Sequence, residues 1–273
     1  MPAQRLAGHD DAGWRDSSPR HCLASRGTDD ASRRPSAEGS VPRMAGRFRM
    51  GRSSQANASS VGSREQVIAR YLAQHEVRKL QIGAGPKRVD GWLCSDLNPS
   101  REGTIRLDVT QPFPFPDGCL DYIYAEHLIE HLSWKQGQRM LAECRRVLRG
   151  GGILRVATPD LARLVAVYCG NAGAAGEQYL RYMHDRFTPR QRVHPVVLMN
   201  LVMHAWGHTF LYDAEMLTFA LGDAGFDSIV QCSFGRSDFA DLRKLERHHV
   251  GGNPAKAEAV RFETMIFEAA APA

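Results

Sequence analysis

The sequence predicts an α/β fold built on a mostly parallel sheet. Short apolar runs alternate with helical patterns between residues 79 and 160, as parallel strands with crossover connections require. Two late apolar runs follow without a long crossover pattern between them, which predicts that one late strand runs antiparallel. The 273 residues are 43% hydrophobic, which is sufficient for one globular domain with its own core.

The first helix is expected to begin at Ser63, because Ser63 and Gln66 form a capping-box pattern ahead of an amphipathic stretch that runs through Leu72. Five apolar runs bounded by turn residues then predict strands. These strands are expected at Lys79–Ile82, Trp92–Ser95, Thr104–Leu107, Leu120–Tyr124 and Ile153–Ala157.

A helix is predicted over Trp134–Leu148, where apolar residues recur at helical spacing, and the run Gly150–Gly152 is expected to end it. Asp160 is a typical N-cap for the next helix. The remaining elements are an irregular helical region over residues 174–210, a helix from Asp213 to Gly225, and strands at Ser228–Cys232 and Val260–Phe267.

Charge divides the chain into a tail and a domain. Residues 1–64 carry eleven arginines against six acids, whereas residues 65–273 carry 24 basic and 24 acidic residues. Residues 1–62 are rich in arginine, serine and alanine and poor in large apolar residues, so we predict a disordered tail. Residues 63–273 are expected to form the domain. Because residues 65–273 are formally neutral, a nucleic-acid partner is not expected.

The apolar stretches are short. The longest, Val196–Trp206, is interrupted by Asn200 and His204 and cannot span a bilayer, and no N-terminal apolar signal region is present. The six cysteines are scattered without a CxxC pair, which favours reduced thiols. We therefore expect a cytoplasmic protein without a membrane span.

Polar groups end three of the predicted strands. The loop Gly83-Ala84-Gly85 follows the first strand, and its glycines let the backbone approach a ligand closely. Asp96 ends the second strand, where a carboxylate suits two ribose hydroxyls or an Asx turn. Asp108 ends the third strand, where it either forms a strand-end turn or accepts a hydrogen bond from an adenine amine while the backbone N–H of Val109 donates to a ring nitrogen. The order of these groups predicts a nucleotide-like pocket.

This order of segments resembles the class I S-adenosylmethionine-dependent methyltransferases, and within them the type-11-like group often found among polysaccharide and cell-surface synthesis proteins. The resemblance covers residues 78–160 and continues more loosely through GHTFLYDAEMLTFALGDAGF. Further landmarks are PFPFPDG, Asp121-Tyr122-Ile123-Tyr124 and the run Arg146–Gly152. It implies a Rossmann-like, doubly wound, three-layer fold with a mostly parallel sheet and an antiparallel late strand.

The resemblance also assigns cofactor roles to particular residues. It implies that the glycine loop holds the methionine part of S-adenosylmethionine, Asp96 the ribose and Asp108 the adenine. Two departures stand out: Gln81 occupies a position that is often acidic, and Asp96 lies only 11 residues after Gly85, which predicts a shortened first crossover. The expected cofactor-binding residues are Gln81, Gly83, Ala84, Gly85, Asp96, Asp108 and Val109.

His127 is the candidate catalytic residue, because it follows the fourth strand and has a pKa suited to a general base. An equal alternative is that it only packs or orients the loop. Residues 174–212 are expected to form a helical insertion on the substrate side, and its arginines either bind an anionic group or form a solvated face. We predict methyl transfer to a small-molecule or glycan-type acceptor.

Three other functions remain as alternatives. A non-catalytic nucleotide-binding module is suggested by Gln81 and the short crossover. A zinc hydrolase is suggested by His127-x-x-Glu130-His131, which matches a zinc motif with two histidines at i and i+4, and His204 and His208 share this spacing. The methyltransferase interpretation requires no metal. The missing third glycine disfavours an NAD-dependent oxidoreductase.

Overall fold

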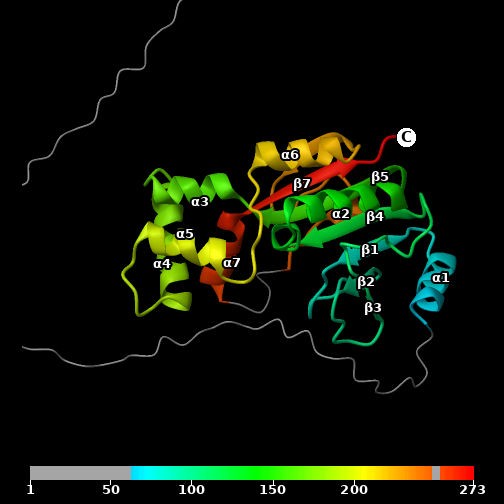
Figure 1. Cartoon of the computed structure of the whole chain (residues 1–273), viewed down its shortest axis with the longest axis horizontal. Coiled ribbons are helices and arrows are strands. Elements are labelled where there is room, and N and C mark those ends of the chain that lie inside the picture. The colour runs from blue at the N-terminus through cyan, green and yellow to red at the C-terminus, as the bar shows by residue number, and fades with distance from the viewer. Residues whose placement is uncertain (1–62, 248–252) are drawn as a thin grey trace, which may run out of the picture. The chain divides into compact units, whose positions relative to one another are not determined.

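The computed structural model describes residues 63–247 and 253–273, which belong to one compact unit (Figure 1). The predicted disordered tail, residues 1–62, lies outside the described residues. A seven-stranded sheet with the order β3-β2-β1-β4-β5-β7-β6 forms its centre. None of the described helices has the length and apolarity needed to cross a membrane.

The strands confirm the predicted fold class, a Rossmann-like sheet that is mostly parallel and has an antiparallel late strand. β1 pairs in parallel with β2 and β4, whereas β7 runs antiparallel to both β5 and β6. The strands are β1 (Lys79–Ile82), β2 (Leu93–Asp96), β3 (Thr104–Arg106), β4 (Leu120–Glu126), β5 (Leu148–Pro159), β6 (Asp227–Cys232) and β7 (Thr264–Ala270).

Three helices share the main core with one face of the sheet. They are α1 (Arg64–Gln74), α2 (Trp134–Val147) and α6 (Ala214–Asp223), and their buried residues include Ile68, Met140 and Leu217. Alternate strand residues point to opposite faces, so Leu80 and Ile82 join this core while Gln81 faces the other side. The predicted capping box of Ser63 and Gln66 is present at the start of α1.

Four further helices gather at one end of the sheet (Figure 1). They are α3 (Leu161–Tyr168), α4 (Gly173–Phe187), α5 (Pro195–His204) and α7 (Pro254–Glu263). Their apolar faces form a separate cluster that includes Leu164, Tyr179 and Leu198. Asp160 caps α3 as predicted, because its side chain accepts a hydrogen bond from the backbone of Ala162.

Two predicted element boundaries are wrong. The last turn of α7 occupies Val260–Glu263, and the strand predicted from Val260 begins only at Thr264. The run Gly150–Gly152 does not end a helix, because α2 stops at Val147 and these glycines lie inside β5. Apolar residues fit a buried helix and a buried strand equally well, and therefore the pattern alone did not separate them.

On the second face of the sheet, the first crossover was expected to be short. The connection between β1 and β2 contains no helix, which confirms the shortened first crossover. Residues 233–247, here called the covering segment, fold over this face instead, and they contain one 3₁₀ turn (Ala240–Leu242). Leu242 and Leu245 of the covering segment pack in a cluster with Trp92 and Tyr124.

A buried arginine ties the covering segment to the sheet. Arg155 of β5 is fully buried and donates through Nε to Glu246 Oε1 at 2.7 Å and through Nη1 to the carbonyl of Arg236 at 3.0 Å. Nη1 also pairs with Glu268 of β7. Glu246 Oε2 in turn accepts from the backbone N–H of Gly235 at 3.0 Å. One cation therefore compensates two carboxylates that would otherwise be buried alone.

We expect Arg155→Met to destabilise the fold by about 3–5 kcal/mol, because removal of one member of a buried ion pair leaves its partners buried and unpaired. The free energy of unfolding should be measured by urea denaturation. Arg149→Met is the matched control in the same strand, since Arg149 is half exposed in its pair with Asp121 and should cost about 1 kcal/mol or less. Equal losses for both variants would contradict this account of Arg155.

Candidate active site

The glycine loop and Asp96 form one hydrogen-bonded unit at the carboxyl ends of β1 and β2. Gly85 donates its backbone N–H to Asp96 Oδ2 at 2.9 Å, and Ala84 donates to the carbonyl of Ser95 at 2.9 Å. Gly83 and Gly85 both have positive φ, at 66° and 51°. Because β1 lies between β2 and β4, the loop stands at the centre of this edge of the sheet.

The two glycines differ in what surrounds them. A Cβ on Gly83 would come within 3.2 Å of the side chain of Leu128, whereas a Cβ on Gly85 would meet no atom within 4 Å. Gly83 therefore serves close packing against the residues that follow β4. Gly85 instead leaves open space above the loop, next to the carboxylate of Asp96.

Both predicted carboxylates also shape their own turns. Asp96 Oδ1 accepts from the backbone N–H of Asn98 at 2.8 Å, which is the Asx turn. Asp108 Oδ1 accepts from the backbone and the hydroxyl of Thr110, at 3.0 and 2.7 Å. Each carboxylate oxygen has more than one lone pair, so these bonds leave acceptor capacity for a ligand. The side chain of Val109 is buried in the main core, which leaves only its backbone for a ligand.

Gln81 holds the glycine loop from below. Its side-chain amide donates to the carbonyl of Lys87 at 2.9 Å, and its oxygen accepts from the backbone N–H of Val89 at 3.0 Å and from the thiol of Cys94 at 3.3 Å. The residue is buried. Gln81 therefore positions the connection between β1 and β2, and its place among the cofactor-binding residues stays a prediction.

His127 is part of a buried ion pair. Its Nδ1 lies 3.1 Å from Glu130 Oε1, and its Nε2 lies 3.0 Å from the hydroxyl of Thr264. Burial alone would lower the pKa of His127, but the hydrogen bond and charge of Glu130, with the charges of Glu263 and Glu126, raise that pKa to about 9. His127 is therefore protonated at neutral pH, and the predicted role as general base does not fit this geometry.

The zinc motif does not have the geometry that its spacing suggested. His127 has a positive φ of 48° and precedes a 3₁₀ turn (Ile129–His131), so His127 and His131 do not share a face of an α-helix. His131 instead meets His208, with ring centroids 4.9 Å apart. The proximity of His131 and His208 was not predicted, because no local pattern joins residues so far apart in the chain.

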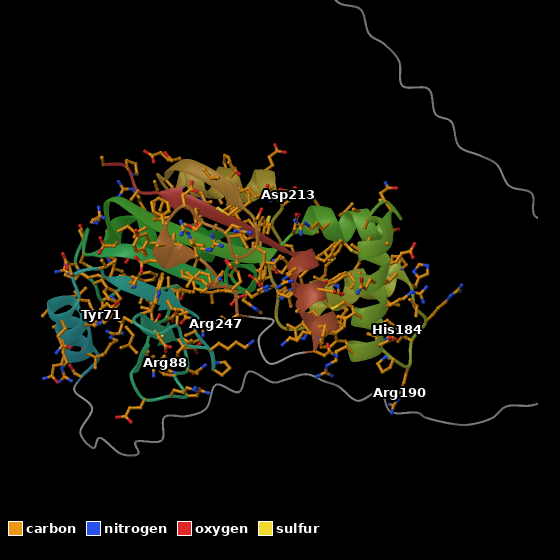
Figure 2. All side chains as sticks on the ribbon, turned by 180° about the vertical axis from the view of Figure 1, so that it is seen from behind. Tyr71, Arg88, His184, Arg190, Asp213 and Arg247 are labelled. Carbon is orange, nitrogen blue, oxygen red and sulfur yellow. The ribbon has the colours of Figure 1, made fainter. Side chains whose placement is uncertain are left out.

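The covering segment also reaches the candidate site. Arg247 donates its backbone N–H to Glu126 Oε2 at 3.0 Å, and its carbonyl accepts from Lys87 Nζ at 2.5 Å. Its guanidinium lies 3.5 Å from the carbonyl of Arg88, and Figure 2 shows both residues on the same side of the molecule. The end of the covering segment therefore joins the end of β4 to the loop that follows β1.

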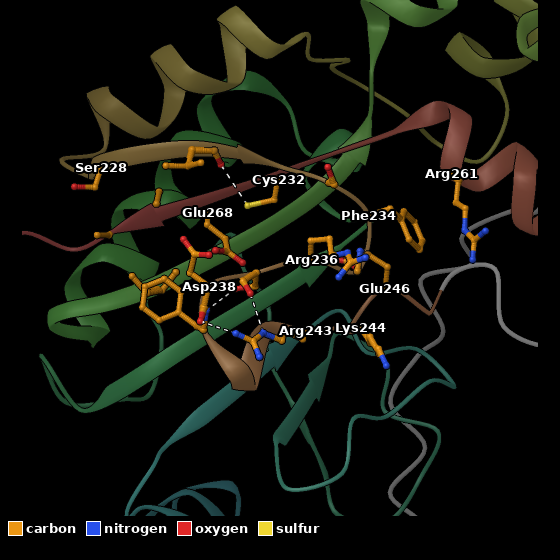
Figure 3. Close-up of a pocket in the computed structure, with 18 of the residues that line it drawn as sticks. Ser228, Cys232, Phe234, Arg236, Asp238, Arg243, Lys244, Glu246, Arg261 and Glu268 are labelled. Carbon is orange, nitrogen blue, oxygen red and sulfur yellow. Dashed lines mark hydrogen bonds between the residues drawn. The ribbon is translucent and has the colours of Figure 1, made fainter.

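A cavity of about 1290 Å³ lies between the covering segment and strands β5, β6 and β7 (Figure 3). Its cationic lining residues are Arg236, Arg243, Lys244, Arg247 and Arg261. The acids that line it are Asp238, Glu246 and Glu268, and Arg155 pairs with the last two. Because Gly83, Gly85, Asp96 and Asp108 do not line this cavity, it borders the candidate site through Arg247 and does not contain it.

The predicted arginine cluster of the helical region is divided. Arg181 and Arg186 of α4 line a second hollow of about 610 Å³ with Tyr182 and Asp185. Arg190 lies beyond α4 at the outer end of the helices (Figure 2). Arg192, the fourth arginine of this region, lies at another place with His184 and His194. The four arginines therefore do not form one anion site in the described structure.

The comparisons with known proteins point to one family. Residues 61–156 match the family model described as a methyltransferase domain. Curated proteins from two strains of Mycobacterium tuberculosis, described as probable S-adenosylmethionine-dependent methyltransferases, are 31% identical over 160 residues, which cover 57% of this chain and 45% of each relative. A Mycolicibacterium smegmatis protein of similar description is 30% identical over 157 residues, 58% of this chain and 47% of the relative.

A solved S-adenosylmethionine-dependent methyltransferase from Archaeoglobus fulgidus is 18% identical, with a TM-score of 0.43 over 77% of this chain and 95% of that chain. The chain spans about half the length of the curated relatives it matches. The family model and the curated relatives confirm the resemblance to class I methyltransferases for residues 61–156.

We expect the stability of the fold to fall between pH 6.5 and 9. The pKa of His127 is raised from 6.5 to about 9, so its protonation stabilises the fold fully below pH 6.5, and this contribution is lost as the pH rises through 9. The full shift corresponds to about 3 kcal/mol. Urea denaturation across this range should show the decline, and His127→Gln should flatten it. A wild-type curve as flat as that of the variant would contradict the ion pair.

Proposed function

We propose that this chain, whose residues 61–156 match the methyltransferase domain family, binds S-adenosylmethionine and transfers its methyl group to an acceptor. The observation that carries the proposal is the bond from Gly85 N–H to Asp96 Oδ2, which sets a partly exposed carboxylate beside open space above a glycine loop. A nucleoside with a flexible amino-acid arm requires both features: acceptors for its ribose hydroxyls and a backbone without a Cβ in its path.

The donor would be held by residues from three strand ends. Asp96 offers carboxylate oxygens to the ribose, and Asp108 with the backbone of Val109 offers an acceptor and a donor to the adenine. Gly83, Ala84 and Gly85 would lie under the methionine part. Gln81 supports this set indirectly, since its amide fixes the positions of Lys87 and Val89.

When bound, S-adenosylmethionine supplies an activated methyl group on a sulfonium. The chain has to bind and orient the acceptor in line with that methyl group and to exclude water. His127 contributes to this orientation as a buried cation between Glu130 and Thr264, because it does not accept a proton at neutral pH. It is a positioning residue in this proposal.

The acceptor in this proposal is a small molecule or a glycan-type intermediate. The cavity that borders the site through Arg247 supports this, since it is large enough for a sugar-sized group and its cations suit a carboxylate or phosphate. The helical region, residues 174–212, also returns to the site, because Thr209 donates its N–H to the carbonyl of Glu130 at 2.8 Å. Acceptor selection is therefore assigned to the covering segment and this region.

A non-catalytic module that binds the same donor is the second candidate. The observation that favours it is that both ring nitrogens of His127 are engaged within the fold, Nδ1 by Glu130 at 3.1 Å and Nε2 by the hydroxyl of Thr264 at 3.0 Å. The two candidates make different predictions for acceptors, because the module would bind S-adenosylhomocysteine and leave every acceptor unmodified.

We expect S-adenosylhomocysteine to bind the full chain saturably in a calorimetric titration, and Asp96→Asn to weaken that binding about 10- to 100-fold through the loss of charged hydrogen bonds. Asp90→Asn is the matched control, because Asp90 is an exposed acid in the same connection. NAD should not bind. Absence of heat with S-adenosylhomocysteine at high concentration would overturn the proposed function, and an equal loss in both variants would overturn the role of Asp96.

Alanine substitutions at Gly83 and Gly85 should differ in their effects on stability and on donor binding. Both have positive φ, so an alanine costs about 1 kcal/mol or more of backbone strain at either position. Gly83→Ala adds contact with Leu128 and should lower stability further, whereas Gly85→Ala extends a methyl group into open space and should mainly reduce binding of S-adenosylhomocysteine. Thermal unfolding and calorimetry of both variants provide the measurement. Unchanged binding in Gly85→Ala would remove the donor from this loop.

A further inference from the structure

Two histidines and a buried glutamate converge beside the carboxyl end of β4. Glu130, His131 and His208 each present one ligand-type atom, and these three atoms lie within 4.8 Å of one another. They come from two segments that are distant in the sequence, the turn after β4 and the stretch between α5 and α6. The zinc-hydrolase alternative drawn from the sequence used a different set, with His127 in place of His208.

The two segments are fastened together by their backbones. The carbonyl of Glu130 accepts from the N–H of Thr209 at 2.8 Å and from that of Phe210 at 3.3 Å. The carboxylate of Glu130 is also fixed, because its Oε2 accepts from the hydroxyl of Thr158 at 2.9 Å in a fully buried position. The segments that carry Glu130 and His208 are therefore held side by side by the fold.

The tautomer of His208 is determined by its other contact. Its Nδ1 lies 2.8 Å from the carbonyl oxygen of Val202, and a carbonyl can only accept a hydrogen bond. The hydrogen of the neutral ring is thus on Nδ1, and the lone pair is on Nε2. A histidine that ligates a metal is commonly oriented in this way, through a bond from its second ring nitrogen to a backbone carbonyl.

We propose that Glu130, His131 and His208 bind a divalent transition-metal ion of the zinc class. Two imidazole nitrogens and one carboxylate oxygen are a donor set that zinc takes in sites with three protein ligands and a fourth, open position. Tetrahedral zinc holds its ligand atoms about 3.4 Å apart, so the widest separation in the cluster, at most 4.8 Å, needs to shorten by up to about 1.4 Å on binding. The edge-to-face packing of His131 on His208 already brings their rings to a centroid distance of 4.9 Å.

The open position would bind an oxygen of the acceptor, and this second step rests on the proposed function. It follows from the location of the cluster at the end of β4, where the turn also contacts Gly83 through Leu128. Metal binding itself requires neither donor nor acceptor. The two proposals therefore fail separately, because metal can be titrated without S-adenosylhomocysteine, and S-adenosylhomocysteine can be titrated into chelator-treated protein.

The test is a titration of the chelator-treated full chain with Co²⁺, followed through the visible absorption of the bound ion, and then displacement by Zn²⁺ with the metal content measured by plasma emission. The expected result is about one ion per chain and a four-coordinate cobalt spectrum. His131→Ala and His208→Ala should each lower the affinity for Co²⁺ at least about tenfold. Loss of a residue that only orients a ligand already lowers metal affinity about tenfold or more, and loss of the ligand itself should lower it further.

His204→Ala is the matched control. His204 is an exposed histidine four residues before His208, outside the cluster, and its replacement should leave affinity and spectrum unchanged. Circular dichroism of each variant separates loss of a ligand from loss of the fold. Two results would overturn the site: wild-type binding well below one ion per chain, or folded His131→Ala and His208→Ala variants that bind as tightly as wild type.

Discussion

The short connection between β1 and β2 is the constraint on which most of this structure depends. Only ten residues lie between Gly85 and Asp96, and β2 occupies the last of them, so no crossover helix fits. One face of the sheet would then expose Trp92 and Tyr124 to water. The covering segment, residues 233–247, resolves this with Leu242 and Leu245, and the ion pairs of Arg155 hold it in place.

The absence of a first crossover helix also changes how the glycine loop is held. In a doubly wound fold the first helix fixes the loop and places its positive N-terminal dipole near the ligand. Here two hydrogen bonds hold the loop instead. The amide of Gln81 donates to the carbonyl of Lys87, and Asp96 at the end of β2 accepts from the N–H of Gly85. Recognition of the donor therefore relies on carboxylate acceptors and open backbone, and Arg247 brings a cation to the same loop from far along the chain.

The sequence predicted what local patterns encode. Apolar runs located the strands of the sheet, and the caps at Ser63 and Asp160 located two helix starts, because each signal lies within a few residues. The contact between Arg247 and Glu126 and that between His131 and His208 were not predictable, since each joins distant segments that read as polar surface. The hydrogen bonds of Gln81 to Lys87 and Val89 were also not predicted, because these partners lie in a loop with no regular structure.

Two roles were open for His127 from the sequence, a general base and a residue that packs or orients the loop. Its position after β4 suggested a base. The fold, however, places Glu130 of the following turn and Glu263 at the end of α7 near it, and the charges of these acids raise the pKa of His127. With His127 protonated, an acceptor hydroxyl requires another source of activation, whereas a nucleophile that carries a lone pair at neutral pH requires none. A metal ion held by Glu130, His131 and His208 would supply that activation by lowering the pKa of a bound hydroxyl, and because it would engage the carboxylate of Glu130 it would also lower the pKa of His127. The state of His127 and the identity of the acceptor are therefore linked through one carboxylate, Glu130, which contacts His127 and belongs to the histidine cluster.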